Sequence, residues 1–177
     1  MRHPITSAVV LCFVFFAMAF SILAQSIAVP GRDKLERALL GARLPLETAL
    51  AVSSTEGTPI SAKYEIDDGG FQLSVYTVKT DAFSDDTFLE VIVDFNTGTV
   101  SRVEPITDSG DLAAAQSQKA AMAGARRSLE AATASTVKAN AGYRAVSALP
   151  DLDGGRPVAE IILVRGSEWK VVSEPLD

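Results

Sequence analysis

The chain has 177 residues, a formal net charge of −6 at pH 7 and 47% hydrophobic residues. An acidic surface argues against nucleic acids and anionic membrane surfaces as partners. The single cysteine is Cys12 and the single histidine is His3, so the rest of the chain has neither. This excludes disulfides, serine–histidine or cysteine–histidine nucleophiles and Cys/His zinc sites from nearly all of the chain.

The N-terminus has the three-part pattern of a secretory signal peptide. Arg2 supplies positive charge, residues 8–23 carry no charged side chain, and small residues follow. We predict a signal peptide over residues 1–24 and, from it, a bacterial protein that is periplasmic or secreted.

Cleavage of this signal is predicted between Ala24 and Gln25. The sequence Ala17-Met18-Ala19 fits the small-x-small rule better, and Ala28 is a third option. The apolar run also approaches the roughly 20 residues that span a bilayer, so the alternative is an uncleaved anchor. Contact with a membrane is expected only in that case.

Residues 25–43 are predicted to form a tether and a short helix. Asp33 is a candidate N-cap, and Gly41 interrupts the helix. One helical face is predicted to carry Leu35, Leu39 and Leu40. Pro45 suits the first turn of a second helix, since a proline there loses no hydrogen bond. We expect this second helix to end near Gly57. Its predicted inner face comprises Leu46, Ala49, Leu50 and Ser53.

Three alternating segments follow, "TPISAKYEI", "FQLSVYTVK" and "TFLEVIVDF". Alternation of apolar and polar residues is typical of half-buried strands, and polar turns or loops separate the three. The predicted apolar faces are Ile60, Ala62, Tyr64 and Ile66; Phe71, Leu73, Val75 and Thr77; and Leu89, Val91, Val93 and Phe95. Tyr76 and Val78 are expected on the opposite face. The chain then turns at Asn96-Thr97-Gly98 and leaves the sheet through "TVSRV".

The second half opens with an alanine-rich stretch, residues 112–140, that has no proline and favours a long helix. Gly124 is a candidate break. The predicted inner stripe comprises Met122, Leu129, Ala132, Thr136 and Val137. The segments "YRAVSALPDLDGG", "RPVAEIILV" and "SEWKVVSEPLD" predict three more strands, with Gly166-Ser167 as a hairpin turn.

Both halves therefore have the order helix, strand, turn, strand, strand, and both place an acidic Gly-Gly turn after the first strand. This predicts an internal repeat. The predicted fold class is α+β: two repeats of a helix packed on a small antiparallel three-stranded sheet, over residues 44–104 and 112–177.

The segment from "PLETALAVSSTEG" to "VIVDFNTGTV" resembles a PepSY domain. The "AL" helix, the strand ending at a polar glycine turn, the "YTV" strand and a closing Asp-x-x-Thr-Gly turn (Asp94, Thr97, Gly98) carry the resemblance. Residues 112–177 resemble a degenerate copy without that turn. The resemblance implies a non-catalytic module, because the family occurs in propeptides of thermolysin-type metalloproteases and in exported bacterial proteins. A role in inhibiting or regulating peptidases has been proposed for the family, and no functional residue comes with it.

Several carboxylates are candidate sites. Asp94 is interpreted as a turn residue, because Asp and Asn side chains accept hydrogen bonds from nearby backbone N–H groups. The sequence DLDGG from Asp151 resembles the start of a calcium loop, but position twelve, which needs a bidentate Glu, is Ile162. The other turn carboxylates either collect a weak cation or solvate loops: Asp67, Asp68, Asp81, Asp85 and Asp86. We predict no metal site, no cofactor and no catalytic residue.

Two further features have a binding and a structural interpretation. Arg126 and Arg127 form a basic pair on the predicted long helix, either for an acidic partner or as a solvated helix face, with Lys119 and Lys138 nearby. Trp169 is either a binding aromatic or a core residue of the last strand.

Small sheets leave open edges, and an open edge can accept an extended peptide as an additional strand. We therefore hypothesise a non-catalytic exported module that binds another envelope or secreted protein and regulates or inhibits a peptidase. Edge-to-edge pairing of the two repeats would close that edge. A small-ligand or cation-binding envelope protein is a second hypothesis. A carboxylate hydrolase is a third, which the missing histidine disfavours.

Overall fold

The computed structural model describes residues 31–80 and 85–177, so the predicted signal peptide and Asp81 lie outside the described residues. The helices are α1 (Arg32–Leu39), α2 (Leu46–Ser53), α3 (Ser109–Met122) and α4 (Leu129–Ala139). The strands are β1 (Thr58–Asp67), β2 (Gly70–Lys79), β3 (Thr87–Val93), β4 (Val100–Pro105), β5 (Arg144–Asp153), β6 (Arg156–Arg165) and β7 (Glu168–Pro175). The fold is α+β, as predicted.

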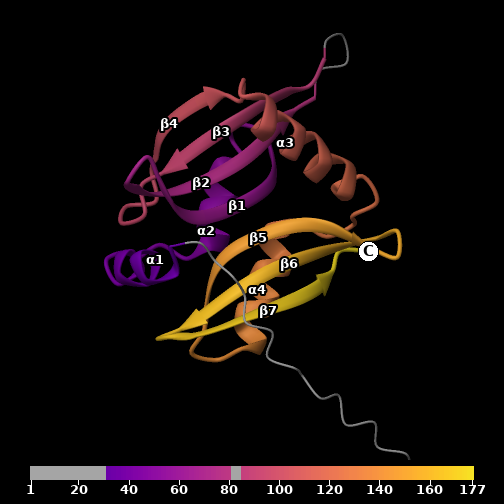
Figure 1. The fold of residues 1–177 in the computed structure, drawn as a ribbon. Helices are drawn as coiled ribbons and strands as arrows, with labels where there is room; N and C mark the ends of the chain where they lie inside the picture. Colours follow the sequence, from indigo (N-terminus) through magenta and orange to yellow (C-terminus); the bar gives the residue numbers. More distant parts are fainter. Residues whose placement is uncertain (1–30, 81–84) are drawn as a thin grey trace, which may run out of the picture.

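The seven strands form one antiparallel sheet in the order β4-β3-β2-β1-β5-β6-β7 (Figure 1). The prediction of two small three-stranded sheets is therefore wrong, and the alternative that the two repeats pair edge to edge is confirmed. The first half contributes four strands, because "TVSRV" pairs with β3 as β4. The two halves also join edge to edge, since β1 pairs with β5.

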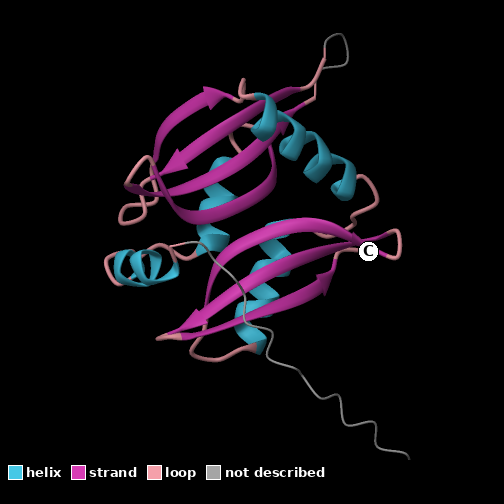
Figure 2. Cartoon of the chain, viewed as in Figure 1, coloured by secondary structure: helices cyan, strands magenta, loops and turns pink. Residues whose placement is uncertain are grey.

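The junction between the two half-sheets is narrow. β1 and β5 pair only through Ala62 with Ala148 and Lys63 with Ser147. On either side the half-sheets diverge, and α1 lies against β1 at one end while α3 contacts β1 and β5 at the other. Helices α2 and α4 pack against each other on the far face of the sheet (Figure 2).

The larger core lies between α2, α4 and the sheet. The predicted inner face of α2 is confirmed, since all four of its residues are buried. The predicted apolar faces of β2 and β3 also line this core, through Phe71, Leu73, Val75, Val91, Val93 and Phe95. Apolar burial of this kind is the main driving force for the fold.

Helix α1 differs from its prediction at both ends. Gly31, whose φ of 70° suits glycine, is the N-cap, and Asp33 lies inside the first turn. Leu35 and Leu39 are buried as expected, but Leu40 follows the helix and is 88% exposed. Leu40 therefore does not belong to the inner face.

A β-bulge changes the facing of β1. Its register against β2 shifts between Pro59 and Ser61, and an extra residue of this kind reverses the alternation of side chains. Ile60 consequently joins a second core cluster with Tyr76, Val78 and Phe88 on the other side of the sheet. The prediction that Ile60 shares a face with Ala62 and Tyr64 is wrong, because the sequence pattern does not reveal the bulge.

The predicted long helix is two helices. α3 begins at the N-cap Asp108 and packs its Ala115 in the second cluster, whereas α4 begins at the N-cap Ser128 and buries Leu129 in the larger core. The two cores lie on opposite faces, so one straight helix cannot serve both. The break falls near Gly124, the candidate position, which packs against Pro157.

Arg144 connects the second half to the segment between α1 and α2. Its guanidinium donates hydrogen bonds to the backbone carbonyls of Leu39 (3.2 Å), Ala42 (2.8 Å) and Leu44 (3.1 Å). It also lies over the ring of Tyr64, 5.1 Å from the centroid. The planar guanidinium has five N–H donors, so it can bond several carbonyls at once. Arg144 thereby connects segments about 100 residues apart in the sequence.

Candidate functional site

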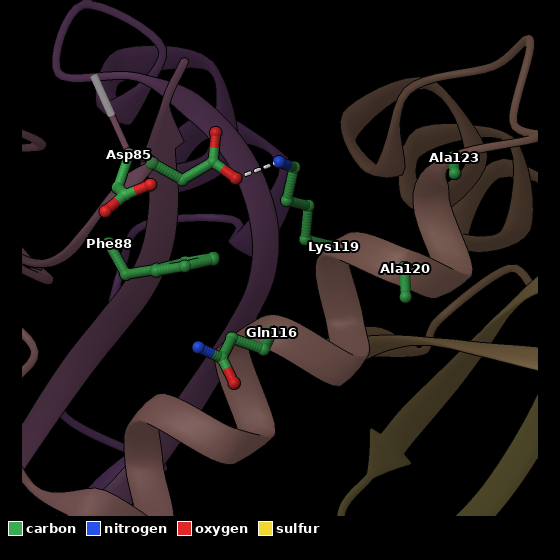
Figure 3. Close-up of a pocket in the computed structure, with 7 residues that line it drawn as sticks. Asp85, Phe88, Gln116, Lys119, Ala120 and Ala123 are labelled. Atoms are coloured by element: carbon green, nitrogen blue, oxygen red, sulfur yellow. Dashed lines mark hydrogen bonds and ion pairs between the residues drawn. The ribbon is translucent and has the colours of Figure 1, made fainter. Parts of the chain in front are cut away.

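A pocket of about 560 Å³ lies between α3 and the segment that enters β3 (Figure 3). Its lining residues are Asp85, Asp86, Phe88, Gln116, Lys119, Ala120 and Ala123. Lys119 reaches across the pocket to an ion pair with Asp86, and this hydrogen bond lowers the pKa of the Asp86 carboxyl. Lys119 and Asp86 thus pair with each other, and the buried Phe88 lines the same pocket.

The described carboxylates do not form a metal site. Within residues 31–80 and 85–177, no three or more His, Cys, Asp or Glu residues lie together in a metal-binding group. Asp67 and Asp68 lie at one end of β2, and Asp85 and Asp86 follow its other end. A ten-residue strand spans about 30 Å, which is too far for one cation to bridge.

Asp94 organises the turn after β3. Its Oδ1 accepts hydrogen bonds from the backbone N–H groups of Asn96 (2.9 Å) and Thr97 (2.7 Å). Gly98, with φ of 75°, closes the turn through its N–H to the carbonyl of Asp94 (2.8 Å). This geometry agrees with the interpretation of Asp94 as a turn residue.

The same hydrogen bonds predict a pH dependence. Donation from the Thr97 and Asn96 N–H groups lowers the pKa of Asp94 below its usual 3.8. A lowered pKa adds stability above the pKa of the unfolded state, and this stability is lost as the pH falls through the folded pKa. Urea unfolding between pH 6 and pH 2.5 should therefore show a steeper loss of stability in the wild type than in Asp94→Asn. Parallel curves would contradict this role.

The DLDGG sequence forms the tip of the β5–β6 hairpin. Asp151 accepts a hydrogen bond from the N–H of Leu152 at 2.8 Å, and Gly154 and Gly155 both have positive φ. The carboxylates of Asp151 and Asp153 are exposed. The segment is a tight two-residue turn, which explains its glycines without a bound ion.

The basic pair lies in the loop between α3 and α4, not on a helix as predicted. The N–H groups of Arg126 (2.6 Å) and Arg127 (3.0 Å) both donate to the carbonyl of Leu176. The Arg127 guanidinium also bonds Glu174 (2.8 Å) and the carbonyl of Pro175 (2.9 Å). The pair therefore anchors the C-terminal end of β7, so neither sequence interpretation describes it.

Trp169, on β7, contacts α1 rather than lying wholly in the core. Its indole N–H donates to Glu36 Oε1 at 2.5 Å, and the Arg32 guanidinium lies 5.1 Å from the centre of its ring. Arg32 also bonds Glu36 (3.0 Å) and the carbonyl of Ser167 (2.6 Å). The Trp169 N–H, followed by Arg32, lowers the pKa of Glu36.

The sheet has two terminal strands, β4 and β7, and β4 is protected. Its register against β3 shifts near Ser101, which marks a bulge, and Pro105 closes its end. Arg102 and Glu104 place charges along it. Bulges, prolines and charges are the devices by which proteins prevent edge-to-edge pairing.

The edge of β7 is regular and open. Its register against β6 runs without a shift from Glu168 to Pro175. The N–H of Leu176 donates to the carbonyl of Pro157 at 3.0 Å, so the backbone N–H of Leu176 points toward β6. Because backbone groups alternate in direction along an antiparallel strand, those of Trp169, Val171 and Ser173 point away from β6. Val171 is 43% exposed, so this row carries an accessible apolar side chain.

Residues 43–104 match a family model described as "Peptidase propeptide and YPEB domain", or PepSY. The chain contains a PepSY domain. No curated protein and no solved structure matches the chain. The PepSY domain comprises α2 and β1 to β4, so it contains the protected edge but not the open one.

Both α1 and the second half lie outside the PepSY match, and they form the Trp169 contacts and the open edge. Sequence reasoning named Trp169 but missed Arg32 and Glu36 as its partners. Only the spacing of Arg32 and Glu36, one helical turn apart, indicated that these two side chains could act together. In the part of the chain that the structure describes, no helix is long and apolar enough to cross a membrane.

Proposed function

We propose that this PepSY-domain protein is an exported, non-catalytic module that binds another protein of the cell envelope or the exterior. The partner contributes an extended segment that pairs with β7 as an eighth strand of the sheet. Export follows from the predicted signal peptide, and the partner class follows from the family. A peptidase is the partner that we favour, with the module regulating or inhibiting it.

The observation that carries this proposal is the outward row of Trp169, Val171 and Ser173. Strand addition uses such backbone groups for affinity and neighbouring side chains for specificity. The contrast with β4 supports the choice of edge, because a bulge interrupts the register of β4 whereas the register of β7 is unbroken. The junction of β1 with β5 leaves β7 as a terminal strand, so pairing of the two halves does not close this edge.

A matched pair of proline variants tests the edge. The N–H of Val171 points away from β6, so Val171→Pro removes no hydrogen bond of the sheet and should fold. Val103→Pro makes the same change at β4. The N–H of Ile106 donates to the carbonyl of Phe88 on β3, and by alternation the N–H of Val103 points away from β3. Pull-downs from the native envelope should recover a stoichiometric partner with the wild type and Val103→Pro but not with Val171→Pro.

Two results would contradict the proposal. One is the absence of any stoichiometric partner, and the other is a partner that Val171→Pro retains while its thermal midpoint stays close to that of the wild type. If the partner is a peptidase, adding the purified chain should slow its hydrolysis of casein, and Val171→Pro should not.

Ligand or cation binding is the second candidate function, and it has less support. The acidic turns lie at opposite ends of β2, and the pocket of Figure 3 has its lysine paired with Asp86. The acidic turns are therefore too far apart to hold one cation together, and the lysine of the pocket already pairs with Asp86.

A further inference from the structure

At its first outward residue, Trp169, the open edge is contacted by α1. This helix places Arg32 over the indole ring of Trp169 and accepts the indole N–H at Glu36. It thereby occupies the space beside the first outward residue of β7. An added strand that pairs at Trp169 would bring its own side chain to the same space.

Beside α1 lies a pocket of about 290 Å³ with a mixed lining. Leu35 of α1 and Val146, Ile162 and Trp169 of the second half form an apolar part of it, and Lys63, Glu65 and Ser147 form a polar part. Ile162 pairs with Val171 across the sheet, so the apolar part is continuous with the exposed apolar side chain of the edge. Release of α1 would uncover a place for an apolar side chain next to the outward row.

Helix α1 is also weakly stabilised as an isolated element. It has eight residues and no side-chain cap at its N-terminus. Isolated helices shorter than about 12–15 residues are marginal in water, so α1 depends on its contacts. These contacts are two buried leucines, the hydrogen bonds of Arg32 and Glu36, and the bond from Arg144 to the carbonyl of Leu39.

We infer that α1 is a displaceable cover of the β7 edge, and that the partner's strand replaces it with a large apolar side chain against Trp169. The inference rests on the proposed function and adds the chemistry and the regulation of the same edge. The covered state binds the partner weakly, because the binding-competent state is only partly populated.

The cover can be tested on the full chain without a partner. Trp169 is the only tryptophan, so its fluorescence reports directly on the contact with α1. Amides of α1 should exchange hydrogen on the order of 100-fold faster than those of β6, through local opening. Arg32→Ala should raise both the exchange of α1 and the acrylamide quenching of Trp169 about twofold, with β6 unchanged. Arg37→Ala, an exposed position on the same helix, is the matched control and should change neither.

Two outcomes would overturn the inference that α1 is a displaceable cover: α1 amides that exchange only at the rate of β6 amides, and acrylamide quenching of Trp169 that Arg32→Ala does not change. Both outcomes would leave the proposal about the β7 edge standing. In the second arm, the protein recovered by pull-down should bind Arg32→Ala about twofold more tightly than the wild type, because the open state of α1 is about twofold more populated. Equal or weaker binding would overturn the inference. An α1 that opens in a chain that captures no partner would instead overturn the proposed function, and with it the partner's part of this inference.

Discussion

Replacing Gly98 with Val is expected to lower the free energy of unfolding by about 3 kcal/mol. Gly98 has φ of 75°, a left-handed conformation that a β-branched side chain adopts only with strain. A Cβ at this position would also lie 3.0 Å from Leu44 Cδ1. The Leu44 backbone is held, since its N–H bonds the carbonyl of Phe95 at 2.9 Å and its own carbonyl accepts from Tyr64, so only rotation of the half-buried Leu44 side chain can relieve this contact. Urea unfolding of the two proteins measures the difference.

Gly69→Val is the matched control for this substitution. Gly69 has φ of 79°, but a Cβ there would meet nothing within 4 Å. Its cost should be about 1–2 kcal/mol, from backbone strain alone. Equal costs at the two positions would show that the contact with Leu44 is unimportant. A Gly98→Val protein that folds normally yet loses a binding partner would contradict the structural interpretation of this turn.

Replacing Arg144 with Met is expected to cost about 3 kcal/mol, because three backbone carbonyls lose a charged donor while the aliphatic stem is kept. The loss should concentrate on α1, whose last turn ends at the carbonyl of Leu39. We therefore expect faster amide exchange in residues 32–39, together with a lower thermal midpoint.

Arg156→Met is the corresponding control, since Arg156 is an exposed arginine at the start of β6. A surface change of this kind is expected to stay within about 0.5 kcal/mol. If Arg144→Met were equally mild, the connection between the two halves would depend on apolar packing and the β1–β5 pairs rather than on this side chain.

The local elements were largely predictable from the sequence. Alternation identified β1 to β3 and β5 to β7, and the buried face of α2 followed from helical spacing. The turn at Asp94 was predictable because Asp, Asn and Gly have specific roles in turns. The facing of Ile60 was not, since a single extra residue in a bulge leaves no mark in the pattern.

The sequence predicted the kind of candidate site, an open sheet edge, but not the residues around it. An open edge was expected from the small number of strands, and Trp169 was named as a binding candidate. Its partners Arg32 and Glu36 come from a helix more than 130 residues away in the chain, so no local pattern relates them. Arg126 and Arg127 were assigned to a helix face because alanine-rich sequence favours helix, whereas the chain must cross from one face of the sheet to the other at that point.

By itself, the sequence determined six of the seven strands, the buried face of α2, the turn at Asp94 and the kinship with PepSY domains, because these depend on neighbouring residues and their periodicity. The tertiary structure decided that two helix-and-strand units share one sheet, that β4 is protected while β7 is open, and that α1 covers Trp169. These features depend on which strand edges meet across long sequence separations. Such pairing is governed by backbone hydrogen bonds that any sequence can form, so residue identity specifies it only weakly.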